Sequence, residues 1–334
     1  MIRIKLSTIA PTWPWIRQTP GSRGIWDNCQ FFVDQDMAEC DYWVVYGDLL
    51  KVEAVRCPLE NTVFITGEPP SIKQYDPRFL RQFATVITFH RNVSHPNVIH
   101  TQPALPWHVG RREKNETNTA FTKNYDELKS MINVESKDRL ISVISSNKAF
   151  TEGHRKRMAF VEYLCQHFGS RLDMFGRGLG PIEDKWDAIV RYKYHIVLEN
   201  GSFRDYWTEK VADAFLGLSY PLYYGCPNLT DYFPKEAFTA IDINDFGASI
   251  AAIEKAIDGD FYENSLESLR QAKAMVLDRY NIFAVLSDFC GQRQSCGIPR
   301  HVVLKPEGVA HSGVAAALRA LATKPHRLLA RLSG

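Results

Sequence analysis

The second half of the chain alternates short apolar segments with amphipathic ones, and this alternation limits the folds that it can adopt. The spacing of apolar residues predicts strands at 140–145, 172–175, 194–198, 221–224 and 238–243. It predicts helices at 153–168, 185–190, 208–218, 249–257 and 266–286. Apolar strands separated by helices form a parallel sheet with helices on both faces. We therefore predict an α/β fold.

The length of the chain predicts more than one domain, because 334 residues exceed one ordinary core. In the first half, strands are expected at 42–46, 63–66, 85–89 and 98–100, and the alternation over 2–6 is typical of a half-buried strand. The polar segment 110–124 has no periodicity and is expected to be a loop or linker. We predict two domains, 1–125 and 126–299, followed by a tail, 300–334.

Charge, hydropathy and cysteine content exclude several classes of protein. The formal net charge of +2 gives no argument for a nucleic-acid partner. The chain has no apolar run long enough for a membrane-spanning helix, and its N-terminus lacks the apolar block of a signal peptide. Its seven cysteines include no C-x-x-C pair, so we expect reduced thiols and a cytoplasmic location. No pattern predicts a metal site.

Polar and charged residues follow the expected strand 194–198. Ligands of parallel α/β sheets bind where strand carboxyl ends meet helix N-termini. Asn200, Tyr206, Glu209 and Lys210 lie at such a junction, where a lysine and free N–H groups favour an anion. The alternative is that Glu209 only complements the helix dipole and that Lys210 is solvated.

A second junction follows strand 140–145 and contains Ser146 and Asn147. Arg157 lies in line with the expected buried face of helix 153–168, near its N-terminal end. A guanidinium at that place would face a cleft and bind a diphosphate. The alternative is a buried arginine paired with a neighbouring acid.

Three segments occur in a fixed order: 192–200 (YKYHIVLEN), 205–210 (DYWTEK) and 220–225 (YPLYYG). Together they resemble the donor-binding signature of glycosyltransferase family 10, the α-1,3/4-fucosyltransferases, and the chain looks like a soluble member of the bacterial type. The resemblance covers residues 139–290 and is weak over 60–110. It implies a GT-B architecture, with two Rossmann-like domains that face each other across a cleft. The N-terminal domain would hold the acceptor and the C-terminal domain the GDP-fucose donor.

The resemblance also implies roles for individual residues. Arg157 and Lys210 would neutralise the donor diphosphate, and Asn200 and Tyr206 would contact the nucleotide. Glu209 would contact the ribose, or the sugar as it gains positive charge in the transition state. Ser146 and Asn147 would complete the donor site.

An inverting transfer also needs a general base for the acceptor hydroxyl. Glu68 follows strand 63–66 on a loop stiffened by Pro69 and Pro70, and it matches the family's glutamate in the N-terminal domain. We therefore expect Glu68 and Glu209 to be the catalytic residues. The alternative for Glu68 is a solvated loop acid.

The expected reaction moves fucose from GDP-β-L-fucose to a hydroxyl of a glycan that contains GlcNAc. The new bond would be an α-1,3 linkage. Two alternatives stay open: another nucleotide-activated deoxysugar on the same fold, and a non-catalytic protein that binds a glycan or a nucleotide. No obligatory cofactor is expected, while stimulation by Mg²⁺ or Mn²⁺ stays open.

The tail, 300–334, carries six lysine and arginine residues and one glutamate. Val314, Leu318 and Leu321 share one face of a helix. A basic amphipathic helix binds an anionic membrane surface, so we expect peripheral membrane contact on the cytoplasmic side. The alternative is a helix packed on its own domain.

Overall fold

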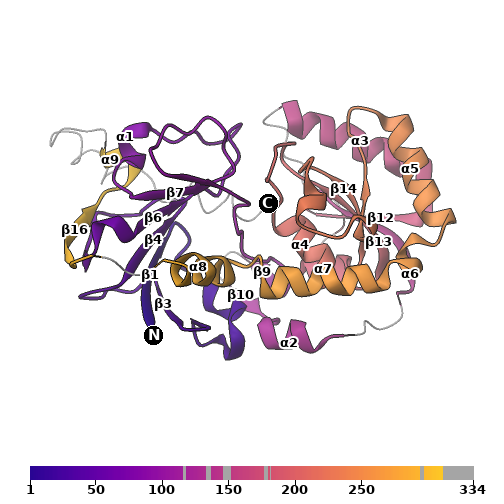
Figure 1. Cartoon of the computed structure of the whole chain (residues 1–334). Coiled ribbons are helices and arrows are strands. Elements are labelled where there is room, and N and C mark those ends of the chain that lie inside the picture. The colour runs from indigo at the N-terminus through magenta and orange to yellow at the C-terminus, as the bar shows by residue number, and fades with distance from the viewer. Residues whose placement is uncertain are drawn as a thin grey trace. The chain divides into compact units, whose positions relative to one another are not determined.

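The computed structural model describes residues 1–115, 118–132, 137–145, 152–176, 180, 182–293 and 297–310. Two compact units make up the chain (Figure 1). Unit 1 consists of Met1–Pro103 and the described residues from Phe283 onward, and unit 2 consists of Ala104–Ile282. The predicted domains 1–125 and 126–299 divide the chain differently. Residues 104–125 pack into unit 2, and the chain returns to unit 1 after Ile282.

Unit 1 is built on a seven-stranded sheet in the order β2-β3-β1-β4-β6-β7-β8. All neighbours are parallel except β2 and β3. The strands are β1 (Ile2–Thr8), β2 (Ile25–Trp26), β3 (Cys29–Val33), β4 (Tyr42–Tyr46), β6 (Thr62–Ile65), β7 (Thr85–Thr88) and β8 (Val98–His100). The strands expected at 42–46, 63–66, 85–89 and 98–100 are therefore confirmed to within a residue at each end.

The half-buried character expected for β1 is wrong. β1 lies between β3 and β4, and from Ile4 onward its polar residues are buried as well as its apolar ones, while Arg3 near its start is exposed. Lys5 Nζ lies 3.1 Å from a carboxylate oxygen of Glu53, and the hydroxyl of Ser7 donates to the same carboxylate at 2.9 Å. Polar side chains on the second face of this strand are thus satisfied inside the protein rather than by water.

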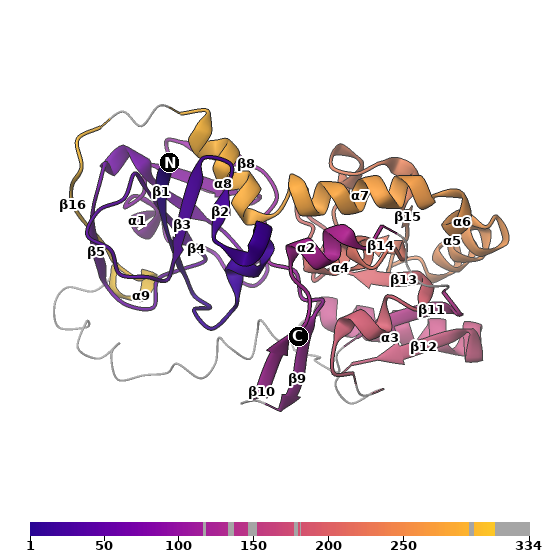
Figure 2. The same ribbon diagram turned by 90° about the horizontal axis from the view of Figure 1, so that it is seen from below.

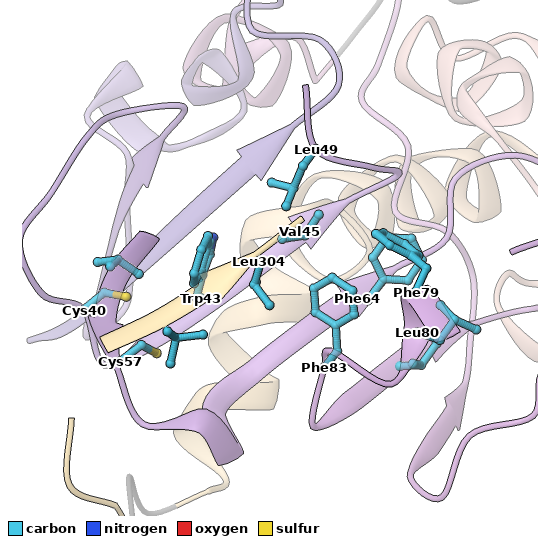
Figure 3. Packing of buried hydrophobic residues seen from close by; sticks show 13 residues of the cluster. Cys40, Trp43, Val45, Leu49, Cys57, Phe64, Phe79, Leu80, Phe83 and Leu304 are labelled. Atoms are coloured by element: carbon cyan, nitrogen blue, oxygen red, sulfur yellow. The ribbon is translucent and has the colours of Figure 1, made fainter. Parts of the chain in front are cut away.

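Segments from the end of the chain complete the core of unit 1. β16 (Arg300–Leu304) pairs antiparallel with β5 (Glu53–Cys57), and Leu304 joins the cluster around Trp43 and Phe64 (Figure 3). The other helices of this unit are α1 (Pro77–Leu80), α8 (Ile282–Gly291) and α9 (Glu307–Ala310), with 3-10 turns η1 (Trp15–Gln18), η2 (Pro20–Ser22) and η3 (Leu59–Asn61).

The beginning of the predicted tail is therefore part of the folded unit, because Val302 and Leu304 are buried. The face of Val314, Leu318 and Leu321 lies outside the described residues. In the part of the chain that the structure describes, no helix is both long and apolar enough to cross a membrane.

Unit 2 contains a five-stranded parallel sheet in the order β12-β11-β13-β14-β15. Its strands are β11 (Arg139–Ile144), β12 (Leu172–Phe175), β13 (Tyr192–Leu198), β14 (Tyr220–Tyr224) and β15 (Thr239–Ala240). Its helices are α2 (Tyr125–Ser130), α3 (Glu152–Phe168), α4 (Glu209–Leu216), α5 (Phe246–Asp258), α6 (Phe261–Asn264) and α7 (Leu266–Asp278), with 3-10 turns η4 (Gly169–Arg171), η5 (Lys185–Ala188), η6 (Leu229–Asp231) and η7 (Lys235–Ala237). Figure 2 shows α4 and α7 on one face of this sheet and α3 on the other. The predicted α/β class, with a parallel sheet in each unit, is confirmed.

Two local predictions in unit 2 are wrong. Residues 110–124, expected to be a loop, contain the antiparallel pair β9 (Arg111–Asn115) and β10 (Asn118–Phe121) (Figure 2). Backbone hydrogen bonds hold this pair, and such bonds require no apolar periodicity. The single helix expected at 266–286 is divided into α7 and α8, and at the break the side chain of Asn281 donates to the carbonyl of Leu277.

Candidate active site

The carboxyl end of β13 and the N-terminus of α4 are joined by a buried carboxylate. Glu199 directly follows β13 and is 0% exposed. Its Oε1 accepts the backbone N–H of Thr208 at 2.8 Å, and its Oε2 accepts the hydroxyl of Thr208 at 2.7 Å. Thr208 is the N-cap of α4, and its hydroxyl accepts the N–H of Lys210. The start of α4 is therefore held against the end of the central strand.

Lys210 lies between two carboxylates. Its Nζ is 3.1 Å from Oε1 of Glu209 and 3.5 Å from Oε2 of Glu199. The side chain of Lys210 is 21% exposed and that of Glu209 is 7% exposed. The alternative of a solvated lysine is therefore wrong, because this ammonium is mostly enclosed and faces two acids.

Burial and charge act in opposite directions on these groups. Burial alone would raise the pKa of Glu209, but the ammonium of Lys210 holds that pKa well below its ordinary value. Burial would lower the pKa of Lys210, but Glu209 and Glu199 raise it. The pKa of Glu199 is raised by burial, against the effect of Lys210. Glu209 and Lys210 are therefore both charged at neutral pH.

Arg157 reaches the same strand end from α3. Its Nη1 donates to the carbonyl of Leu198 at 3.3 Å and to Oδ1 of Asn200 at 2.9 Å. Its Nε is buried and has no hydrogen-bond partner among the described residues. Burial lowers the pKa of Arg157, and Glu199 raises it. These hydrogen bonds go to a carbonyl and an amide, so they do not support the alternative of an arginine paired with an acid.

Residues 134–260, which include all of these groups, match the family model described as glycosyltransferase family 10 (fucosyltransferase), C-terminal. The match covers less than half of the chain. The resemblance found in the sequence is thereby confirmed for this part of the chain.

Curated relatives match the same family. The chain is 32% identical over 131 residues to alpha-(1,3)-fucosyltransferase 4 of Bos taurus, which covers 36% of this chain and 31% of the relative. It is 28% identical over 115 residues to alpha-(1,3)-fucosyltransferase FucT of Helicobacter pylori, covering 32% and 24%. The chain thus spans less than a third of the length of these two relatives.

Solved structures were also compared with the whole chain. A crystal structure of α1,3-fucosyltransferase aligns with a TM-score of 0.49 and 17% identity, covering 84% of this chain and 91% of the other. A crystal structure of α1,3-fucosyltransferase with GDP-fucose aligns with a TM-score of 0.46 and 16% identity, covering 84% and 92%.

The structure brings four of the predicted site residues together in the region that matches family 10: Arg157, Asn200, Glu209 and Lys210. Tyr206 lies in the same segment, where it is 2% exposed and packs edge-on against Phe203. The predicted Ser146 and Asn147 lie outside the described residues. Among the described residues, no group of three or more His, Cys, Asp or Glu side chains is arranged to hold a metal ion.

Glu68 belongs to unit 1 and lies just beyond β6, as expected. Its side chain is partly exposed, and its backbone carbonyl accepts a hydrogen bond from Nε2 of His90 at 2.8 Å. Burial lowers the pKa of His90. The loop that carries Glu68 is thus attached to the loop that follows the neighbouring strand β7.

Three further residues of unit 2 lie around Glu209, and sequence reasoning missed all of them. Lys185 Nζ and His108 Nδ1 each lie 3.9 Å from Oε1 of Glu209. Asp213 is one helical turn beyond Glu209, and its Oδ1 accepts the backbone N–H groups of His108 and Val109. Only the i, i+4 spacing of Glu209 and Asp213 was visible in the sequence.

Proposed function

We propose that the chain is an inverting fucosyltransferase that moves fucose from GDP-β-L-fucose to a hydroxyl of a glycan acceptor. One observation carries the proposal: within the region that matches family 10, Arg157 and Lys210 meet at the carboxyl end of β13 and the N-terminus of α4. Parallel α/β sheets bind their ligands at such ends, and helix N-termini favour phosphate groups. The names of the curated relatives support fucose as the transferred sugar and α-1,3 as the linkage.

The charges of this site fit the needs of a departing nucleoside diphosphate. When the bond between the sugar and the diphosphate breaks, negative charge grows on the phosphate oxygens, and fixed cations lower the barrier by neutralising it. Lys210 supplies one such charge. Arg157 supplies another, and its buried Nε–H makes no hydrogen bond in the described part of the chain, so it is available to a phosphate oxygen.

The carboxylate of Glu209 fits the opposite change in charge. The anomeric carbon becomes positive as the leaving group departs, and a buried, ionised carboxylate stabilises that charge or binds the ribose. Lys210 keeps Glu209 ionised despite its burial.

The acceptor side of the reaction is assigned to unit 1. In one displacement, the acceptor oxygen bonds to the anomeric carbon while the carbon–phosphate oxygen bond breaks, which inverts the configuration. Glu68 takes the proton of the acceptor hydroxyl, and GDP leaves with the electron pair of the broken bond. We propose an acceptor that contains GlcNAc.

Transfer from GDP-fucose to a GlcNAc-containing disaccharide, followed by mass spectrometry, tests this function. Glu68→Ala should abolish transfer and leave GDP binding unchanged, whereas Lys210→Ala should weaken GDP binding by about tenfold or more. Equal transfer by Glu68→Ala would contradict the assignment of the base. A thermal-shift screen of nucleotide sugars tests the donor. If another nucleotide sugar stabilises the protein and GDP-fucose does not, the donor is not GDP-fucose.

We also propose that the reaction needs no obligatory metal and that the protein is cytoplasmic with peripheral membrane contact through its basic C-terminal residues. Activity that persists in EDTA would support the first proposal. Co-sedimentation with vesicles that contain anionic lipid tests the second. A chain that ends at Ala310 should bind these vesicles less than the full chain does, and equal binding would contradict membrane contact.

A further inference from the structure

Glu209 is enclosed by a second lysine that the mechanism above does not use. Lys185 lies on η5, and its side chain is 23% exposed. Its Nζ donates to Nδ1 of His108 at 3.1 Å and lies 3.9 Å from Oε1 of Glu209. Lys185, His108 and Glu209 thus form a compact triangle inside unit 2.

The segment that carries His108 is attached through its backbone to two carboxylates. Asp213 Oδ1 accepts the N–H groups of His108 and Val109 at 3.0 and 3.1 Å. Asp184 Oδ1 accepts the N–H of Gly110 at 2.9 Å, and the same oxygen accepts the N–H of Trp186 in η5. One carboxylate therefore holds this segment to α4, and the other holds it to the turn that carries Lys185.

The hydrogen bond between Lys185 and His108 has only one direction. A lysine ammonium has three donors and no acceptor, so Nδ1 of His108 must accept and the ring proton must lie on Nε2. Burial and the charge of Lys185 both lower the pKa of His108, which agrees with a neutral ring. His108 thus orients the ammonium without adding a charge of its own.

The charges around Glu209 explain how a second lysine stabilises its carboxylate. Lys210 faces both Glu209 and Glu199, and both carboxylates are buried. A buried carboxylate is costly unless a cation lies beside it, and Glu199 also interacts with the guanidinium of Arg157. Lys185 supplies a further positive charge, 3.9 Å from the same oxygen of Glu209 that Lys210 contacts.

We propose that Lys185 and His108 are positioning residues for Glu209: His108 orients the ammonium of Lys185, and that ammonium holds the carboxylate in one orientation toward the bound nucleotide sugar. The expected effect on catalysis rests on the proposed function. The contacts among Lys185, His108 and Glu209 do not depend on it. Neither residue needs to touch the substrate, since each acts through the carboxylate.

Steady-state kinetics with GDP-fucose test the proposal. Lys185→Met should lower kcat by at least about tenfold, with the affinity for GDP within about threefold of the wild type. Lys185→Arg should restore most of the lost kcat, because it returns the charge. Lys193→Met is the matched control, since Lys193 pairs with Glu263 at the surface of the same unit, and it should leave kcat unchanged. A kcat for Lys185→Met within about twofold of the wild type would overturn the role.

Nitrogen NMR of the histidine rings provides a readout that does not depend on activity. In the full-length protein without nucleotide, His108 should show an unprotonated, hydrogen-bonded Nδ1 and a protonated Nε2. This signature should change in Lys185→Met and persist in Lys193→Met. A protonated Nδ1 in the wild type would overturn the triangle. Absence of any transfer by the wild type would contradict the proposed function, while the NMR result would still decide the pairing.

Discussion

Thr208 donates two hydrogen bonds to Glu199, one from its backbone N–H and one from its hydroxyl, at 2.8 and 2.7 Å. The carboxylate comes directly after the central strand, and the threonine is the N-cap of α4. This pair therefore sets the distance between the strand end and the helix start. Arg157 and Asn200 lie at the strand end, and Glu209 and Lys210 lie at the helix start.

Replacing Thr208 tests the importance of this connection. Thr208→Ala removes an N-cap, worth about 1 kcal/mol, and a buried hydrogen bond to a carboxylate, worth about 1.5–3 kcal/mol. We expect the free energy of unfolding, measured with urea, to fall by about 2–4 kcal/mol, with a weaker affinity for GDP. Thr208→Ser keeps both hydrogen bonds and should stay close to the wild type. Equal stability of the alanine and serine variants would contradict this account.

Gly225 provides an independent test of the space around Glu199. A Cβ at this position would overlap with a side-chain carbon of Glu199 and with the hydroxyl of Tyr223, and both side chains are buried. We therefore expect Gly225→Ala to destabilise the protein by about 2 kcal/mol or more in thermal or urea unfolding and to weaken GDP binding. Gly247→Ala is the control, because a Cβ there meets its nearest atom at 3.8 Å. If Gly225→Ala changes neither the stability nor the affinity for GDP, then Glu199 can move without an effect on either.

Asp213 gives the stability of the protein a dependence on pH. Burial raises the pKa of Asp213 from 3.8 to about 7, against the effect of Lys185. The folded state then binds more protons than the unfolded state between these values, so stability is lost as the pH rises from about 4 through about 7. Asp213→Asn keeps an acceptor for the backbone of His108 and Val109 but cannot ionise.

We therefore expect Asp213→Asn to be more stable than the wild type at about pH 8, by about 2–4 kcal/mol. The two proteins should have similar stability at about pH 4, where the carboxyl is protonated in the folded state. Urea unfolding at both pH values measures the difference. A constant difference across this range would mean that Asp213 does not titrate as described.

Arg157 and Asn200 act together in the proposed donor site. Asn200 Oδ1 accepts from Arg157 Nη1 at 2.9 Å and so orients the guanidinium. Arg157→Lys should weaken GDP binding by about tenfold or more, because an ammonium lacks the planar set of donors. Asn200→Ala should weaken it less, by about threefold to tenfold, since the charge remains. Calorimetry with GDP measures both, and Arg191→Lys, which changes an exposed ion pair with Asp138, is the control. An unchanged affinity in Arg157→Lys would remove this residue from the site.

The strands and helices of unit 2 were largely predictable from the sequence, and so was the junction at which the candidate site lies. A buried helix face or strand imposes a periodic pattern on neighbouring residues, and residues at strand–helix junctions can be named from that pattern alone. Arg157, Asn200, Glu209 and Lys210 were identified in this way. The antiparallel pair β9–β10 was not, because backbone bonding leaves no such pattern in its side chains.

The surroundings of Glu209 were decided by the tertiary structure alone. Lys185 and His108 are 77 residues apart in the chain, and Asp213 is 105 residues from His108. Their contacts form only when the sheet and α4 bring three separate segments together. The sequence determined which side chains stand at the ends of strands and helices, since that depends on local burial. Which charges meet inside the protein, and hence which groups stay ionised, depended on packing between distant segments.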